Sequence, residues 1–462
     1  MVTVTSYGAA KTVTGSCHVM ELEDSTKIMI DCGMFQGTEE HRNYEPFGFD
    51  PKSVDYLLIT HGHLDHVGRI PLLVKDGFRG TIVATEATLD IAKIVLLDAA
   101  KLMEEDYKTR YKKALRKGKE KLVKKPLYTE EDVKKAFRLD KIVVNYGKRV
   151  KLAKKVSAIF YDAGHIIGSS FIEIRYPEFS IKKSVIFSGD LGNKKNGVLP
   201  PPQYPPSAST LFVESTYGDR LHRSYKDSVT EFKRAVIDTI LSGGNVLIPS
   251  FAIERTQQIL CILKEMSQRG ELPSSTKVFL DSPMAIKTTK VYQKHRYLLA
   301  KRCKKSDKPF KFKQLIPVTT VEESKKINYL WSGNIIIAGS GMCTGGRILH
   351  HFKHRLWNRK NSVIFVGYQA KGTLGREIVD GAKFIKIFDE EIVVRAKIYT
   401  INGFSAHADQ GELIEWILEI ADLQKIFLIH GEEEKQKILK TALSNALNIK
   451  SHIVTDREKI FI

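Results

Sequence analysis

A short segment of the sequence carries four side chains of the kinds that bind metals. His61, His63, Asp65 and His66 fall within six consecutive positions, directly after an apolar run at residues 56–60 that predicts a buried strand. Neutral imidazole and carboxylate suit Zn²⁺, with Mn²⁺ and iron as lesser candidates. Alternation along the chain puts His61 and His63 on one side, whereas Asp65 and His66 turn toward a second position. The segment therefore predicts one turn that serves two adjacent ions.

Three further candidate ligands follow predicted strands elsewhere in the chain: His165, Asp190 and His430. A lone histidine or aspartate at a strand end is more often structural. Their common position, together with the first segment, makes all three predicted metal ligands. Seven candidate ligands are enough for two sites that share Asp190.

The elements that must position these residues are short apolar strands that end in polar or glycine-rich turns. Such strands are predicted at residues 56–60, 158–161, 184–187, 210–213, 397–400 and 425–429. In the middle of the chain four strands are each followed by a helix, at 245–248 and 251–266, 277–280 and 285–297, 334–338 and 346–357, and 363–366 and 374–379. Repeated βα units are typical of a parallel, doubly wound sheet, which predicts a Rossmann-like unit.

Composition changes along the chain predict three segments: 1–207, 208–384 and 385–462. The first is rich in short strands and closes with prolines that cannot continue a helix or a central strand, Pro200, Pro201, Pro202, Pro205 and Pro206. The last is too short for a separate three-layer domain. We therefore expect residues 385–462 to complete the domain begun by residues 1–207, with 208–384 inserted between them.

The composition is that of an ordinary globular protein, with 42% hydrophobic and 27% charged residues in 462. It excludes a disordered chain, a collagen-like fibre and a disulfide miniprotein. No secretory signal or membrane-spanning run is visible, so we expect a soluble, cytoplasmic protein without a membrane partner. The five cysteines form no Cys-x-x-Cys pair, which favours a reducing compartment.

Charge indicates a polyanionic partner, because the chain has a formal net charge of +20. Residues 101–155 hold 20 Lys and Arg against 8 Asp and Glu, so this segment alone supplies +12. We expect it to form a helix over residues 89–125 and a second, short helix opened by Thr129. Lys112, Lys113 and Arg116 are its candidate phosphate contacts, and the alternative is a solvated helical face.

The motifs resemble those of metallo-β-lactamase-fold hydrolases of the β-CASP nuclease family, similar to bacterial and archaeal homologues of the endonuclease subunit of the cleavage and polyadenylation specificity factor. Asp31 matches the first family motif, an acidic residue that holds the metal-binding turn, and the four residues of the turn match the second. His165 matches the third and Asp190 the fourth. The resemblance implies an α/β fold, an αββα sandwich interrupted by a Rossmann-like β-CASP domain.

The same resemblance implies how two Zn²⁺ ions per chain would be held. His61, His63 and His165 would bind one zinc, and Asp190 would bridge the pair. The ligands of the other zinc would be Asp65, His66 and His430.

Three positions match motifs specific to the β-CASP branch: Glu214 (motif A), His407 (motif B) and His430 (motif C). A histidine at motif C resembles the RNA-directed members, whereas the DNA-directed members usually carry valine there.

Elementary chemistry agrees with this assignment. Phosphodiester hydrolysis benefits from two cations that activate water and neutralise the charge of the transition state. The leaving oxygen then needs a proton, for which His407 is the candidate general acid, with Glu214 to orient its ring. The alternatives are a capping or core role for His407 and an ion pair with Arg220 for Glu214.

A glycine-rich turn at residues 339–346 suits a close approach of phosphate to the backbone but lacks the Gly-Lys-Ser/Thr ending of a nucleotide-binding loop. We therefore expect an RNA-backbone contact and no nucleotide cofactor; the alternative is a tight turn without a ligand. The candidate RNA-binding residues outside the basic segment are Arg255, Gly341, Gly345, Arg347 and Ser405.

These observations favour a zinc-dependent ribonuclease that cuts single-stranded RNA in a cleft between two domains. A DNA-processing nuclease of the same family is opposed by His430, and a small-molecule hydrolase by the inserted domain and the charge. A catalytically silent RNA-binding subunit is opposed by the complete set of ligands. Internal cleavage, 5′ to 3′ exonuclease action, and the oligomeric state all stay open.

Overall fold

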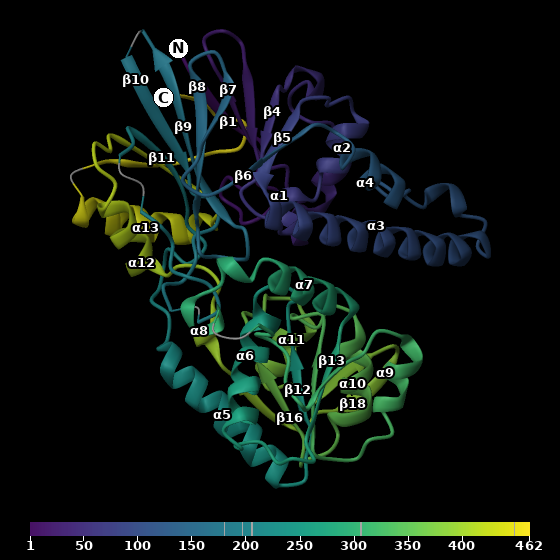
Figure 1. Cartoon of the computed structure of the whole chain (residues 1–462). Helices are drawn as coiled ribbons and strands as arrows, with labels where there is room; N and C mark the ends of the chain where they lie inside the picture. The colour runs from purple at the N-terminus through teal and green to yellow at the C-terminus, as the bar shows by residue number, and fades with distance from the viewer. Residues whose placement is uncertain (180, 196, 205–206, 305–306, 448) are drawn as a thin grey trace. The chain divides into compact units, whose positions relative to one another are not determined.

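The structure is a computed structural model that describes residues 1–179, 181–195, 197–204, 207–304, 307–447 and 449–462. The described residues divide into two compact units (Figure 1). The first unit contains residues 1–194, 201–221 and 407–462, and the second contains residues 195–200 and 222–406. Every candidate metal ligand belongs to the first unit.

Two mixed sheets form the centre of the first unit. In spatial order, one consists of β22 (Lys459–Phe461), β1 (Thr3–Ser6), β2 (His18–Glu21), β3 (Lys27–Ile30), β4 (Tyr56–Leu58), β5 (Thr81–Thr85) and β6 (Lys141–Val144). The other consists of β21 (Ser451–Ile453), β20 (Lys425–Ile429), β11 (Thr210–Glu214), β10 (Ile181–Phe187), β9 (Ser170–Glu178), β8 (Val156–Asp162) and β7 (Arg149–Ala153). Apolar side chains of both sheets, among them Ile30, Phe160 and Phe212, fill the layer between them.

Helices cover the outer face of each sheet (Figure 1). The first sheet packs against α1 (Leu64–Val67), α2 (Ile70–Lys75), α3 (Glu86–Leu115) and α4 (Glu130–Ala136). The second packs against α12 (Gln410–Leu418) and α13 (Glu433–Ala446). The arrangement is the expected αββα sandwich.

Strand direction brings the candidate ligands together. Strands β10, β11 and β20 are parallel, with Phe187 opposite Phe212 and Glu214 opposite Ile429. Because the carboxyl ends of parallel strands meet at one edge, Asp190, Glu214 and His430 emerge there side by side.

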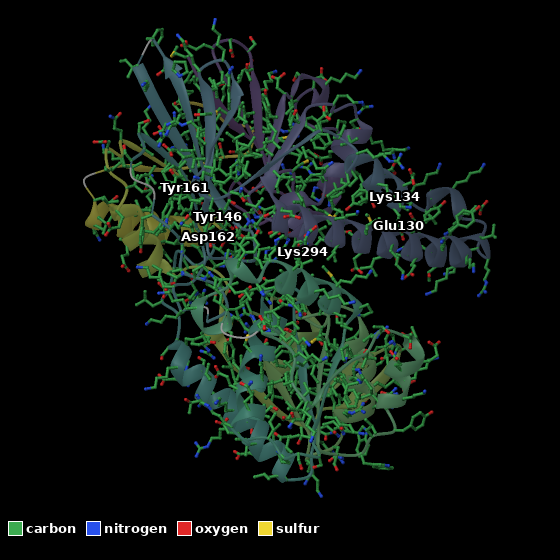
Figure 2. The ribbon with its side chains drawn as sticks, in the orientation of Figure 1. Glu130, Lys134, Tyr146, Tyr161, Asp162 and Lys294 are labelled. Atoms are coloured by element: carbon green, nitrogen blue, oxygen red, sulfur yellow. The ribbon has the colours of Figure 1, made fainter. Side chains whose placement is uncertain are left out.

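The basic segment forms a shorter helix than its composition predicts. Helix α3 ends at Leu115, whereas we expected it to continue to residue 125. Gly118 follows with a φ of +63°, a left-handed conformation that a continuous helix does not allow. Thr129 opens α4 through a capping box with Asp132, as predicted. Helix α4 lies beside α3 (Figure 2), where the Glu130 backbone N–H donates to Glu104 at 3.1 Å.

The second unit is a parallel sheet with helices, as the βα pattern predicts. In spatial order its strands are β14 (Leu315–Pro317), β13 (Lys277–Asp281), β15 (Asn334–Ala338), β12 (Val246–Pro249), β16 (Ser362–Phe365) and β19 (Lys397–Thr400). Its helices include α5 (Tyr225–Leu241), α6 (Arg255–Gln268), α7 (Pro283–Lys294), α8 (Lys301–Lys304), α9 (Val321–Ile327), α10 (Arg347–Arg355) and α11 (Leu374–Val379). A hairpin of β17 (Phe384–Ile387) and β18 (Glu390–Val393) follows.

One predicted strand joins a different sheet from the one expected. Strand β19, which we expected to help complete the first domain, pairs in parallel with β16 of the second unit. The expected segment boundaries, 207/208 and 384/385, stay predictions; the compact units divide at 221/222 and 406/407. Of the proline cluster, Pro205 and Pro206 lie outside the described residues. Within the described parts of the chain, each helix is too short or too polar to span a bilayer.

Candidate metal centre

The turn after β4 directs two histidines into one group with two residues from other strands. His63 Nδ1 lies 3.1 Å from both His61 Nε2 and His165 Nε2. Asp190 Oδ2 lies 3.4 Å from the Nε2 atoms of His61 and His165. These four residues form the first ligand group, and His61 and His165 are fully buried.

A second ligand group adjoins the first. His66 Nε2 lies 3.2 Å from His430 Nε2 and 3.3 Å from Asp190 Oδ1. Asp65 Oδ2 lies 3.6 Å from His430 Nε2. The structure thus brings together all seven residues that the sequence singles out as ligands.

Asp190 stands between the two groups, with Oδ2 toward the first and Oδ1 toward the second. Its position depends on Gly189, which has a φ of +51° and lies where a Cβ would come within 2.7 Å of the Thr60 side chain. Asp190 is 2% exposed, and its Oδ1 has no hydrogen-bond partner among the described residues. A buried carboxylate oxygen without a donor is costly unless a cation compensates it.

The donor atoms fit metal ions. Four ligands about 2.0 to 2.1 Å from a tetrahedral ion lie about 3.3 Å from one another, close to the 3.1 and 3.4 Å separations of the first group. Nitrogen and carboxylate oxygen together are a donor set that zinc accepts. The residues therefore fit a pair of ions, one for each group.

Electrostatics separates the histidines of the turn. Burial lowers the pKa of His63 to about 4 and that of His61 well below its ordinary value, so both rings are neutral near pH 7. Burial also acts to lower the pKa of His66, but the carboxylates of Asp190 and Asp31 raise it well above its ordinary value. Neutral rings offer lone pairs, and a cation at the second group would displace the proton of His66.

Asp31 holds the turn from behind. Its Oδ2 lies 2.7 Å from His66 Nδ1 and accepts the Thr60 hydroxyl at 2.8 Å, while Oδ1 accepts the Thr60 backbone N–H at 2.8 Å. A hydrogen bond from Nδ1 directs Nε2 of His66 toward the second group.

His407 and Glu214 form a pair at the edge of the first group. His407 Nδ1 lies 3.3 Å from Glu214 Oε1 and 3.9 Å from Asp190 Oδ2. Burial acts to lower the pKa of His407, but Glu214 and Asp190 raise it to about 9. Glu214 is fully buried and also accepts the Leu191 backbone N–H at 2.7 Å. Arg220, the alternative partner, pairs with Asp219.

Some residues of the site carry no signal that we recognised in the sequence. Thr60 anchors Asp31, and the Thr216 hydroxyl lies 3.2 Å from His430 Nδ1. His18, to which we assigned no role, lies 2.8 Å from the Ser6 hydroxyl, and burial lowers its pKa to about 3. Thr60 and Thr216 each lie one or two positions from a candidate residue, and that proximity is the signal that could have found them.

The candidate RNA-binding residues of the second unit lie in varied surroundings. Arg255 is buried and donates to Gln258 Oε1 at 2.6 Å, and Arg347 donates to Asp281 Oδ1 at 2.6 Å. Gly341 is buried, whereas Gly345 is half-buried. Ser405 is half-buried directly after the short 3₁₀ helix Asn402–Phe404. Arg347 thus has a structural partner, and the RNA contacts of these residues stay predictions.

Lys112, Lys113 and Arg116 lie at the far end of α3 and are exposed. The opposite end of this helix packs on the metal-binding turn, where a Cβ on Gly62 would come within 2.6 Å of Ile91. At 1.5 Å per residue, Lys112 lies about 30 Å from that contact. Contacts made there would act far from the metal centre.

Three family models match the chain. The metallo-β-lactamase superfamily model matches residues 11–122, the β-CASP domain model residues 256–378, and the Zn-dependent metallo-hydrolase RNA specificity domain model residues 391–454. Together with the relatives that follow, these matches show that the chain belongs to the metallo-β-lactamase/β-CASP family of ribonucleases, which are metal-dependent hydrolases. The resemblance inferred from the motifs is thereby confirmed.

The relatives match over nearly the whole chain. Ribonuclease TTHA0252 of Thermus thermophilus is 41% identical over 436 residues, which make up 94% of this chain and 94% of that protein. Two archaeal proteins named transcription termination factor FttA, from Methanocaldococcus jannaschii and Methanosarcina mazei, are 31% and 29% identical. Those matches cover 94% and 99% of this chain, and 67% and 71% of the relatives.

Proposed function

We propose that the chain is a zinc-dependent ribonuclease that hydrolyses phosphodiester bonds of single-stranded RNA at a centre of two ions. One observation carries the proposal: the two oxygens of Asp190 face two separate groups of histidines. In this proposal His61, His63 and His165 hold one ion, and Asp190 bridges. The second ion is held by Asp65, His66 and His430.

Zinc bound there would supply Lewis-acid chemistry, activating water and neutralising the charge of the phosphodiester. The chain's own residues do the rest. Asp31 fixes the tautomer of His66, and Glu214 fixes the ring of His407 through Nδ1 at 3.3 Å. We assign His407 Nε2 the transfer of a proton to the leaving oxygen, because Nδ1 is directed at Glu214.

RNA as substrate is supported by independent features of the chain. A model described as an RNA specificity domain matches residues 391–454, and a relative over nearly the full length is named a ribonuclease. A histidine stands at position 430, and the formal net charge is +20. A basic surface binds the phosphate backbone of any sequence, so it supports RNA without defining a preferred site.

The test is cleavage of labelled single-stranded RNA, single-stranded DNA and a thioester by purified chain, with and without a chelator. The proposal predicts cleavage of RNA alone, abolished by the chelator and restored by Zn²⁺. His407→Gln serves as a matched protein that should keep its metal but lose most of its activity. Faster cleavage of DNA would support the DNA-processing alternative, and RNA binding without metal-dependent cleavage would support the silent subunit.

A further inference from the structure

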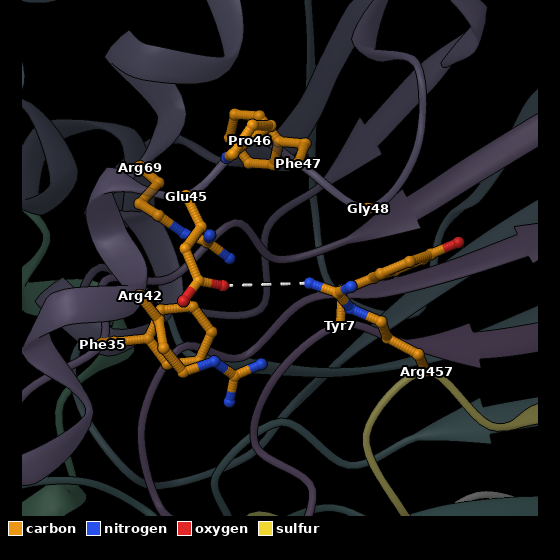
Figure 3. A pocket seen from close by; sticks show the side chains of 9 residues that line it. All are labelled: Tyr7, Phe35, Arg42, Glu45, Pro46, Phe47, Gly48, Arg69 and Arg457. Atoms are coloured by element: carbon orange, nitrogen blue, oxygen red, sulfur yellow. Dashed lines mark ion pairs between the residues drawn. The ribbon is translucent and has the colours of Figure 1, made fainter.

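A pocket in the first unit is lined by three arginines and by none of the candidate metal ligands (Figure 3). It is a hollow of about 270 Å³ that opens to solvent. Arg42, Arg69 and Arg457 extend toward it in Figure 3, and the rings of Phe35 and Phe47 form part of its wall. Arg42 belongs to the 3₁₀ helix Gly37–Tyr44, whereas Arg69 lies just before α2.

Arg69 is the unusual member of this set. It is 4% exposed, and among the described residues no carboxylate forms an ion pair with it. Its Nε donates to the Gly33 carbonyl oxygen at 2.7 Å, but its buried Nη2 has no hydrogen-bond partner in the described part of the chain. Its guanidinium carbon lies 4.5 and 5.0 Å from the ring centroids of Phe35 and Phe47. The aromatic faces hold the group in place without neutralising it fully.

The other two arginines have acidic partners at the surface. Arg42 bonds to Asp456 at 2.9 Å and to Glu39 at 3.2 Å. Arg457 lies 3.9 Å from Glu45, the pair drawn with a dashed line in Figure 3. All three carboxylates are at least one third exposed, so water screens them from the buried guanidinium.

Burying an arginine without a counter-charge costs several kcal/mol, and an unmade hydrogen bond of a charged donor adds to that cost. An anion in the pocket would remove both penalties. We propose that the pocket binds a phosphoryl group, held chiefly by Arg69 with Arg42 and Arg457 as further donors. Guanidinium groups that approach from three sides match a tetrahedral anion with several oxygens better than a flat carboxylate.

The site adjoins the metal-binding turn through the backbone. Gly33, whose carbonyl accepts the Arg69 hydrogen bond, lies where a Cβ would come within 1.6 Å of the Asp65 carbonyl oxygen. The phosphoryl group could come from inorganic phosphate or from a nucleoside monophosphate, whose base would lie against the aromatic wall. Both sources share the chemistry that Arg69 recognises.

The test is calorimetric titration of the zinc-loaded chain with inorganic phosphate and with adenosine 5′-monophosphate. Because phosphate can also bind zinc, the same titrations are made with Asp190→Ala. We expect saturable binding that persists in Asp190→Ala and weakens about 10- to 100-fold when Arg69 becomes Met. Arg42→Gln, whose native residue is less buried, should weaken binding in the same direction if Arg69→Met does not fold. Arg79→Gln, an exposed arginine outside the pocket, is the matched control.

Each result decides between defined alternatives. Tighter binding of the nucleotide than of phosphate identifies a nucleotide site, and equal binding identifies a site for free phosphate. Loss of all binding in Asp190→Ala, or affinities unchanged in both Arg69→Met and Arg42→Gln, would overturn the proposal. Acetate that competes as well as phosphate would overturn the assignment to a phosphoryl group. Failure of zinc-dependent RNA cleavage would leave these binding results unaffected.

Discussion

His66 and Asp31 are joined by a buried contact of 2.7 Å between Nδ1 and Oδ2. Because Asp31 also accepts two hydrogen bonds from Thr60, the carboxylate has little freedom to move away from the ring. Asp31 therefore fixes the side chain that faces Asp190 without being a ligand itself.

Replacing Asp31 by Asn should weaken the second ion selectively. We expect its affinity to fall about 10- to 100-fold, the usual effect of losing a partner behind a metal-binding histidine. Titration with a chelator of intermediate affinity, followed by elemental analysis, measures the loss of each ion. Asp76→Asn, an exposed aspartate of the same unit, is the control. Equal loss of both ions would show that Asp31 supports the whole fold of the turn.

His407→Gln should separate catalysis from metal binding. Seven other residues already fill both ligand groups, so the variant should keep its zinc while the turnover of saturating RNA falls by about 10² to 10⁴. Glu214→Gln should fall less if Glu214 only orients the ring. Loss of zinc in His407→Gln would refute the assigned role.

The basic segment should affect binding and its salt dependence. Changing Lys112, Lys113 and Arg116 to Gln should weaken RNA of every sequence alike, and lower the slope of log affinity against log salt by about 0.7 for each lost phosphate contact. Lys437, Lys440 and Lys450, which are exposed on the same unit, provide a triple control. If the slopes of both variants equal that of the wild type, the end of α3 is only a solvated surface.

Acid should destabilise the second unit partly through His351, which lies 2.7 Å from Asp281 and 3.5 Å from Arg355. Burial lowers the pKa of His351, although Asp281 offsets part of this. The unfolded chain therefore takes up the proton first, and the unfolding free energy falls as pH drops below the ordinary value of about 6.5. The thermal midpoint of His351→Gln should fall less than that of the wild type between pH 7.5 and 5.5. An equal fall would exclude this contribution.

The candidate site could be predicted from the sequence because its chemistry lies at strand ends. His61, His63, Asp65 and His66 are nearly contiguous, and parallel strands must carry Asp190 and His430 to one edge. The layers followed from the same strand and helix patterns.

Other features depend on contacts between distant segments, which no local pattern contains. Strand β19 has the composition of any buried strand, and only its pairing with β16 decides its sheet. Arg347 follows a glycine-rich turn that suggests phosphate, yet its guanidinium meets Asp281, 66 positions away. The pocket around Arg69 likewise combines segments from both ends of the chain.

The measurement that tests the central claim most directly is the zinc content of the chain, determined together with its RNA cleavage rate. The account predicts close to two zinc ions per chain in the wild type. It predicts fewer ions and no detectable cleavage in Asp190→Ala, and about one ion in His430→Ala. One ion per wild-type chain, with the content unchanged in Asp65→Ala and His430→Ala, would contradict a centre of two ions bridged by Asp190.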